Sequence, residues 1–176
     1  MKTLLLAIGV VLLFLSIAVA INFANLLFRG FAPLVLSRKI ALKAILDTIH
    51  PTPGQVLYEL GSGSARFLQM VEKKFPDTTF IGLEYSLFPF LFSRLTLWFK
   101  KSKIQIRREN IFYSDLHNAD IIFCYLLPGM MPVLGTKVRS ECKPGTLFVS
   151  YMFSVPNWQP KQTIRQHGGV IYFYKV

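Results

Sequence analysis

The sequence is poor in the residues that build metal sites and disulfide frameworks. Its 176 residues include only two cysteines, Cys124 and Cys142, and three histidines, His50, His117 and His167. Neither set has the spacing of a zinc site, and two cysteines are too few for a disulfide scaffold. We therefore expect no metal. Cys124 lies in an apolar run, and we interpret it as a small buried hydrophobic residue.

Charged side chains are missing altogether between Thr3 and Phe28. A helix needs about 20 apolar residues to cross the hydrocarbon core, so this run is long enough for a membrane span. The alternative is a cleaved signal peptide, with Lys2 as the charged start and a small-residue cleavage site ending at Ala20. A signal's apolar region ends after about 7–15 residues, whereas this run continues past Ala20, which favours an uncleaved anchor.

Basic residues follow the apolar run: Arg29, Arg38, Lys39 and Lys43. The positive-inside rule places such a basic flank in the cytoplasm. We therefore expect a single-pass membrane protein whose folded domain lies on the cytoplasmic side.

Acidic residues are also few, because 9 Asp and Glu stand against 20 Lys and Arg, a formal net charge of +11. Such a balance suits nucleic acid, anionic lipid or an acidic substrate. The sequence has no RNA-binding signature, no zinc-finger spacing and no long basic run, so we expect no nucleic acid. Beside a cytoplasmic leaflet each basic residue gains about 1 kcal/mol, which makes lipid the simplest explanation.

The rest of the chain alternates between strand and helix patterns. We place the anchor at residues 1–29, an amphipathic helix and linker at 30–54, and one domain at 55–176. The expected strands lie at 55–60, 79–84, 103–107, 119–126, 146–152 and 170–174, and the expected helices at 36–50, 65–74, 89–100 and 130–141. This order predicts a doubly wound, mostly parallel, Rossmann-like α/β sheet. Because only one convincing strand follows residue 152, we expect about six strands.

The helix expected at residues 89–100 is apolar nearly all round. We expect it to be buried against the sheet and the helix before the domain. The alternative is that part of its surface meets a membrane or a membrane-embedded substrate, with Trp98, Lys100 and Lys101 at the interface.

A glycine turn follows the first strand of the domain, where residues 58–66 read YELGSGSAR. Gly61 and Gly63 lack a Cβ, so the backbone can bend sharply and a ligand can approach it. The helix expected from Ala65 offers unpaired N–H groups to that ligand. In a doubly wound sheet, ligands bind at this edge, where the strand order reverses. The alternative is a tight turn without a ligand.

An acidic residue, Glu84, ends the second strand 21 residues after Gly63. Its carboxylate can accept hydrogen bonds from both hydroxyls of a ribose. A dinucleotide would need a third glycine where Arg66 stands. S-adenosylmethionine has no phosphates and needs an acidic residue just before the turn for its ammonium group, as Glu59 is. We therefore expect S-adenosylmethionine as the cofactor.

These motifs resemble those of the class I S-adenosylmethionine-dependent methyltransferases. Residues 59–63 (ELGSG) are similar to motif I, and residues 82–84 (GLE) to the acidic motif that follows it. Four further segments resemble the membrane-anchored protein-lysine methyltransferases of the ATP synthase c subunit and the adenine nucleotide translocase: GLEYSLFPFLFSR (82–94), RENIF (108–112), PGMMP (128–132) and FSVPNWQP (153–160). The likeness covers about residues 36–160.

The resemblance implies an enzyme that methylates a lysine amine of a membrane-associated protein. It also implies that Glu59, Gly61 and Gly63 cradle the methionine part of the cofactor, that Glu84 binds the ribose, and that Asn110 binds the adenine edge. The other expected cofactor contacts are Ser62, Tyr85 and Ile111. The chain departs from the family pattern at Ser64 and Ala65, where Asp-Gly is usual, and at Asn110, where Asp is usual.

Methyl transfer is an in-line displacement, to which an enzyme contributes mainly by aligning the reactants. A lysine must also lose its proton, and an apolar pocket favours this by lowering the pKa of the amine. Tyr125, at the end of the fourth strand, is the one catalytic candidate, because its hydroxyl or its ring could orient an amine. Packing under a loop is the alternative role for Tyr125. Two other functions remain open: methylation of a small or lipid-borne substrate, and a non-catalytic membrane-tethered module.

Overall fold

The computed structural model describes residues 2–28, 38–166 and 168–176, and the chain forms two compact units, residues 1–35 and 36–176. The first unit contains one helix, α1 (Lys2–Phe28). Within α1, side chains are described for residues 2–3, 5–6, 8–17 and 19–20. Among the residues that are described, none forms a helix both long and apolar enough to cross a membrane.

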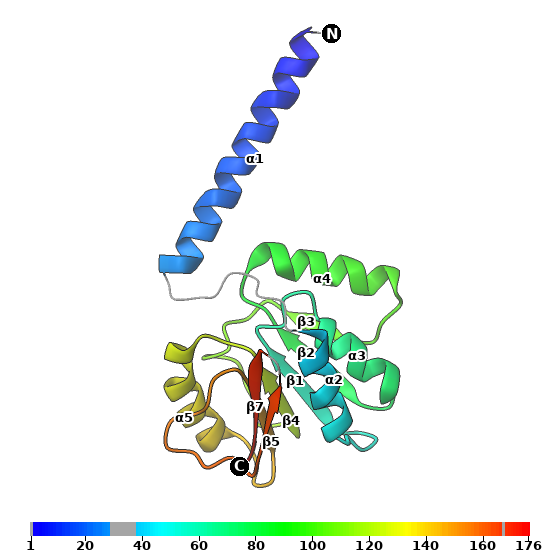
Figure 1. The fold of residues 1–176 in the computed structure, drawn as a ribbon. Helices are drawn as coiled ribbons and strands as arrows, with labels where there is room; N and C mark the ends of the chain where they lie inside the picture. The colour runs from blue at the N-terminus through cyan, green and yellow to red at the C-terminus, as the bar shows by residue number, and fades with distance from the viewer. Residues whose placement is uncertain (1, 29–37, 167) are drawn as a thin grey trace. The chain divides into compact units, whose positions relative to one another are not determined.

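The second unit is built on a seven-stranded sheet in the order β3-β2-β1-β4-β5-β7-β6 (Figure 1). The strands are β1 (Val56–Leu60), β2 (Thr79–Leu83), β3 (Gln105–Arg107), β4 (Ile121–Cys124), β5 (Leu147–Tyr151), β6 (Gln162–Gln166) and β7 (Gly169–Lys175). The first five run parallel to one another, and β7 is antiparallel to both β5 and β6. The predicted doubly wound, mostly parallel α/β sheet is therefore confirmed.

The helices of this unit are α2 (Lys39–Thr48), α3 (Arg66–Lys74), α4 (Leu87–Phe99) and α5 (Met131–Glu141), the last preceded by a 3-10 turn at Pro128–Met130. All four lie where the apolar pattern predicted a helix. Residues 36 and 37, with which the first of these was expected to begin, lie outside the described residues.

The prediction of about six strands is wrong, because β6 and β7 form a hairpin after β5. Strand β6 has the sequence QTIRQ, pairs with β7 alone among the described strands, and leaves most of its side chains in water. An edge strand with only Ile164 packed against the core needs no apolar run, so its pattern resembles that of a loop. Its partner β7 is half-buried and apolar, and this strand was predicted.

The main core lies between the sheet and helices α2 and α3. Leu42 and Ile45 of α2 and Phe67 of α3 are fully buried in one cluster with sheet residues such as Phe123 and Val149. The rings of Phe67 and Phe123 are 4.3 Å apart. Burial of one such side chain stabilises the fold by about 1.5–3 kcal/mol. Helix α2, which we predicted to precede the domain, therefore belongs to the same core as the sheet.

Helix α4 is not buried as we expected. Only Ser93 and Leu97 of its 13 residues are buried. The helix lies beside β3, an edge strand of three residues (Figure 1). The apolar residues on the side of α4 opposite Ser93 and Leu97 therefore stay exposed.

Candidate active site

The strand order reverses at β1. The chain builds β1, β2 and β3 outward toward one edge, and then returns to place β4 on the other side of β1. At such a switch point the loops after neighbouring strands diverge and leave a crevice at the carboxyl edge of the sheet. The glycine turn, residues 61–65, follows β1 directly and lies at this point.

Two glycines of the turn have backbone angles that favour glycine: φ is +72° at Gly61 and +52° at Gly63. The N–H groups of Gly61 and Ser62 both donate to the carbonyl of Leu83, at 2.8 and 2.9 Å, which ties the turn to the end of β2. A Cβ on Gly61 would lie 2.9 Å from a methyl group of Leu126, too close for normal packing. Both glycines are thus required by the shape of the turn.

Ala65 shares the left-handed conformation, with φ of +53°, at the residue that caps α3. This is the position where the resembling family usually has glycine. A left-handed conformation costs a non-glycine residue about 1–2 kcal/mol. The fold holds Ala65 there nonetheless, because its side chain is fully buried and its N–H donates to the carbonyl of Ser62 at 2.7 Å.

Glu84 closes the turn from the β2 side. Its Oε2 accepts a hydrogen bond from the N–H of Gly63 at 2.9 Å, and its Oε1 accepts one from the N–H of Ser86 at 2.7 Å. Glu84 as a residue is only 8% exposed. Each carboxylate oxygen can accept a second hydrogen bond, so both remain able to receive a ribose hydroxyl. Sequence reasoning placed Glu84 at this edge but missed its role in shaping the turn.

Glu59 lies on β1, opposite Phe123 of β4, and is only 7% exposed. Burial raises the pKa of its carboxyl well above the usual value, and the nearby Glu84 adds to the rise, while the N–H of Leu68 in the first turn of α3 opposes it. Among the described residues, nothing hydrogen-bonds to Oε2 of Glu59 or to the buried Oγ of Ser62.

Buried polar atoms without partners are rare in folded proteins. At Glu59 and Ser62 two of them lie beside a glycine turn and the start of a helix. These two groups fit a cofactor with a cationic amine, because an ammonium group would give Glu59 a partner and favour its charged form. The residues therefore fit the methionine part of S-adenosylmethionine.

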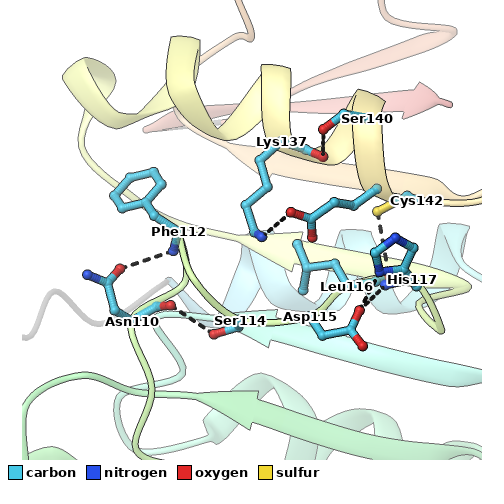
Figure 2. A network of polar contacts seen from close by, with 10 residues as sticks. Asn110, Phe112, Ser114, Asp115, Leu116, His117, Lys137, Ser140 and Cys142 are labelled. Carbon is cyan, nitrogen blue, oxygen red and sulfur yellow. Dashed lines mark hydrogen bonds and ion pairs between the residues drawn. The ribbon is translucent and has the colours of Figure 1, made fainter.

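The predicted adenine contacts follow β3. Asn110 organises the loop from 110 to 114: its Oδ1 accepts a hydrogen bond from the N–H of Phe112 at 3.0 Å, and its carbonyl accepts one from the Ser114 hydroxyl at 2.9 Å (Figure 2). Its Nδ2 is then the group that can donate to a purine nitrogen. Ile111 is buried and offers an apolar contact. Tyr85 is half-buried, and its carbonyl accepts a hydrogen bond from Arg108 Nε at 3.4 Å.

Tyr125 directly follows β4, so its position at the carboxyl edge agrees with the prediction. Its ring is half-buried and meets the ring of Tyr151 edge-on, with centroids 4.8 Å apart. Tyr151, the last residue of β5, is buried, which raises the pKa of its hydroxyl. We missed this residue. Because β4 and β5 are parallel neighbours, a comparison of their predicted ends could have found it.

A group outside this edge contains Asp115, His117 and Glu141, whose ligand atoms lie within 4.8 Å of one another. Asp115 Oδ1 contacts His117 Nδ1 at 2.6 Å, and Glu141 pairs with the ammonium of Lys137 (Figure 2). Asp115 and His117 are exposed. Exposed acidic groups of this kind are common without a metal, and our expectation that no metal is used stays a prediction.

The buried cysteine prediction is confirmed. Cys124 is fully buried in β4, and burial raises the pKa of its thiol to about 12. A thiol in that state is not a nucleophile near neutral pH.

Comparison with known proteins shows the family of the chain. Residues 59–162, more than half of the chain, match the ANTKMT methyltransferase domain. A protein-lysine N-methyltransferase of Saccharolobus islandicus is 24% identical over 150 residues, covering 82% of this chain and 93% of the relative. The adenine nucleotide translocase lysine N-methyltransferase of Mus musculus is 24% identical over 163 residues, covering 88% and 68%.

Solved structures share the fold. An RNA methyltransferase from Salinibacter ruber, in complex with S-adenosyl-L-homocysteine, superimposes with a TM-score of 0.76 at 24% identity, covering 81% of this chain and 94% of that one. A precorrin-6y C5,15-methyltransferase from Geobacter metallireducens follows with a TM-score of 0.65. The chain therefore belongs to the ANTKMT methyltransferase family and is an S-adenosylmethionine-dependent methyltransferase.

Proposed function

We propose that this enzyme methylates the side-chain amine of a lysine in a membrane-associated protein, from a position on the membrane set by its N-terminal segment. The lysine substrate is supported by the two curated relatives, both lysine N-methyltransferases, which align with more than four-fifths of the chain. The observation that carries the cofactor site is a pair of buried atoms beside the glycine turn, Glu59 Oε2 and Ser62 Oγ, which have no hydrogen-bond partner within the described part of the chain.

The chain's own residues would hold the cofactor at the carboxyl edge of β1, β2 and β3. Glu59 would bind the ammonium group, the backbone around Gly61 and Gly63 would pass close to the methionine part, and Glu84 would bind the ribose. Asn110 and Ile111 would face the adenine. When bound, S-adenosylmethionine supplies a methyl group on a positively charged sulfur, which an amine can attack directly.

The amine would enter beside Tyr125 and Tyr151. Their rings form a largely apolar wall, which disfavours the ammonium form of a lysine and so releases its proton to water before the attack. The hydroxyl of Tyr125 can accept a hydrogen bond from the neutral amine and so direct the nitrogen lone pair. Alignment of this kind is the main contribution that an enzyme makes to a displacement reaction.

Membrane attachment is supported by the sequence of residues 1–29. The charge-free run from Thr3 to Phe28 exceeds the length that a span requires, and the basic flank after it would keep the domain on the cytoplasmic side. N-terminal sequencing of the protein purified from membranes tests the anchor. A mature chain that begins at Ile21 would show that the segment is cleaved and would contradict the anchor.

The function is tested by incubating the full-length enzyme, purified from membranes, with membrane extracts and methyl-labelled S-adenosylmethionine. We expect label in protein, recovered as methyllysine after acid hydrolysis. Label in the organic extract would instead indicate a lipid-borne or small substrate. Absence of both label and calorimetric cofactor binding would indicate a non-catalytic module.

A further inference from the structure

Helix α4 exposes a continuous apolar stripe. Six of its side chains are 45–72% exposed: Phe88, Leu91, Phe92, Leu95, Trp98 and Phe99. Their spacing of three, four and seven residues puts them on one side of the helix, opposite the buried Ser93 and Leu97. Monomeric proteins rarely expose contiguous apolar patches of more than a few hundred Å² unless the patch has a function.

Along the chain, the charged residues in and next to α4 have one sign. From residue 85 to residue 108 the chain has no Asp or Glu. It has six basic residues, all of them exposed: Arg94, Lys100, Lys101, Lys103, Arg107 and Arg108. None of the ion pairs between described residues involves any of these six. The ammonium of Lys100, for example, contacts a neutral amide oxygen, that of Gln69, at 2.6 Å.

An aromatic and leucine stripe with basic residues beside it is the composition of a helix that lies in the interface of an anionic bilayer. Trp98 suits that depth, because tryptophan is enriched where hydrocarbon meets headgroups. The 24 residues contain no acidic group, so every charge in the segment is positive. Such a segment suits a partner whose negative charge is spread evenly over its surface, as on an anionic membrane. A protein partner would instead carry individual charges at defined positions.

We propose that α4 is a second membrane contact of this enzyme, and that it docks with its apolar stripe in the headgroup region of an anionic membrane. A groove between α4 and β3 adds a place for the lipid phosphate, because Arg94 and Arg107 both line it together with Trp98. A guanidinium group can donate two parallel hydrogen bonds to a phosphate, which fixes the orientation of the headgroup. This contact does not depend on whether α1 spans the membrane.

Docking through α4 would also bring the active site to the membrane. Ser86, which caps α4, donates its N–H to Oε1 of Glu84 at 2.7 Å, so the helix starts at the cofactor site itself. An enzyme lying on α4 thus has the carboxyl edge of β2 next to the bilayer, within reach of a lysine near the membrane surface. This consequence rests on the proposed function, whereas the docking itself does not.

The two tryptophans of the chain provide a local test in the full-length protein. The Trp158→Phe variant leaves Trp98 as the only tryptophan, which is excited selectively at about 295 nm or above, and the Trp98→Phe variant leaves Trp158, which packs against Phe148, Tyr174 and Arg139. Each is reconstituted into vesicles of phosphatidylcholine with or without phosphatidylglycerol, made with or without brominated acyl chains. We expect brominated lipid to quench the fluorescence of Trp98 in the vesicles that contain phosphatidylglycerol. The fluorescence of Trp158 should not change.

Charge reversal supplies the matched control. In the Trp158→Phe background, Lys100→Glu with Lys101→Glu should relieve the quenching of Trp98. Lys161→Glu with Lys175→Glu changes the net charge equally at exposed sites away from α4 and should not relieve it.

Trp98 emission that is insensitive to brominated anionic lipid would overturn the proposal. So would a lipid-free dimer that buries Trp98 and dissociates on Phe92→Asp, because the stripe would then bind a second copy. Label transfer to methyllysine is measured separately and can succeed when docking fails.

Discussion

The carboxylate of Glu84 reaches across 21 residues of sequence to the backbone N–H of Gly63, which lies 2.9 Å from Oε2. This one hydrogen bond joins the acidic residue after β2 to the glycine turn after β1. The same side chain is therefore a cofactor ligand in our proposal and a brace for the loop that cradles the cofactor.

Glu84→Ala should weaken binding of S-adenosylmethionine by about 10- to 100-fold, since a hydrogen bond to a charged group is worth about 1.5–3 kcal/mol. It should also lower the melting temperature, because the N–H groups of Gly63 and Ser86 lose their acceptor. Titration calorimetry and thermal unfolding measure the two effects.

Glu72→Ala is the matched control. Glu72 also accepts a backbone N–H, that of Lys103 at 2.7 Å, together with the hydroxyl of Ser102 at 2.8 Å, but it lies on α3, outside the proposed cofactor contacts. The Glu72→Ala variant should unfold at a lower temperature than the wild type and should bind S-adenosylmethionine with unchanged affinity. Equal affinity in the wild type and Glu84→Ala would remove the ribose assignment.

Glu59 should make both stability and binding depend on pH. Its carboxyl pKa is raised in the folded chain, so the folded state holds a proton that the unfolded state releases. This contribution to stability is fully present below the ordinary pKa of a glutamate and is lost as the pH rises through the raised value. Glu59→Gln should therefore lose less stability than the wild type between acidic and neutral pH, as thermal unfolding over a pH series would show.

Cofactor binding should reverse the protonation of Glu59, because an ammonium group favours the carboxylate. Wild-type affinity should increase with pH over the same range, and binding should release a proton. Calorimetry in buffers of different ionisation enthalpy counts that proton. Glu59→Gln should bind more weakly and with no such release; if the variant released as many protons as the wild type, Glu59 would not be the ammonium ligand.

Tyr125→Phe should lower the rate of methyl transfer by about tenfold at most, since one neutral hydrogen bond contributes about 0.5–1.5 kcal/mol. Its cofactor affinity should not change, because the ring remains and the residue lies beyond the proposed cofactor contacts. Tyr172→Phe, on the half-buried strand β7, serves as the control with an unchanged rate. A wild-type rate in Tyr125→Phe together with a loss in Tyr125→Ala would assign the role to the ring alone.

Ala65→Gly should change the free energy of unfolding by less than about 1 kcal/mol. Glycine adopts the left-handed conformation without strain, which stabilises the folded state by about 1–2 kcal/mol. The loss of one buried methyl group destabilises it by about 0.8 kcal/mol, and the greater backbone freedom of glycine in the unfolded state by about 0.5–1 kcal/mol. Ala65→Val should destabilise by more than about 2 kcal/mol, because a branched side chain fits neither this backbone nor the full burial of the site. Urea unfolding of both variants measures the difference, and a strongly destabilised Ala65→Gly would contradict the assignment of strain.

The sequence by itself determined the elements whose environment is uniform. Strands such as β4 and β5 are covered on both faces, so they need continuous apolar runs, and these runs were visible at 119–126 and 146–152. The glycine turn was equally plain, because Gly61 and Gly63 adopt backbone angles that other residues avoid. Glu59 and Glu84 were found because an acidic residue at the end of a buried strand stands out from its neighbours.

Only the tertiary structure decided the features that depend on partners distant in the chain. Strand β6 is specified by pairing with β7 and not by its own polar pattern, so it was missed. The exposure of α4 was not predicted, because a helix that is apolar nearly all round does not show which of its sides the sheet covers. In the same way, the contact of Tyr125 with Tyr151 and the two hydrogen bonds of Glu84 arise when parallel strands end side by side, a matter of register that local sequence does not encode.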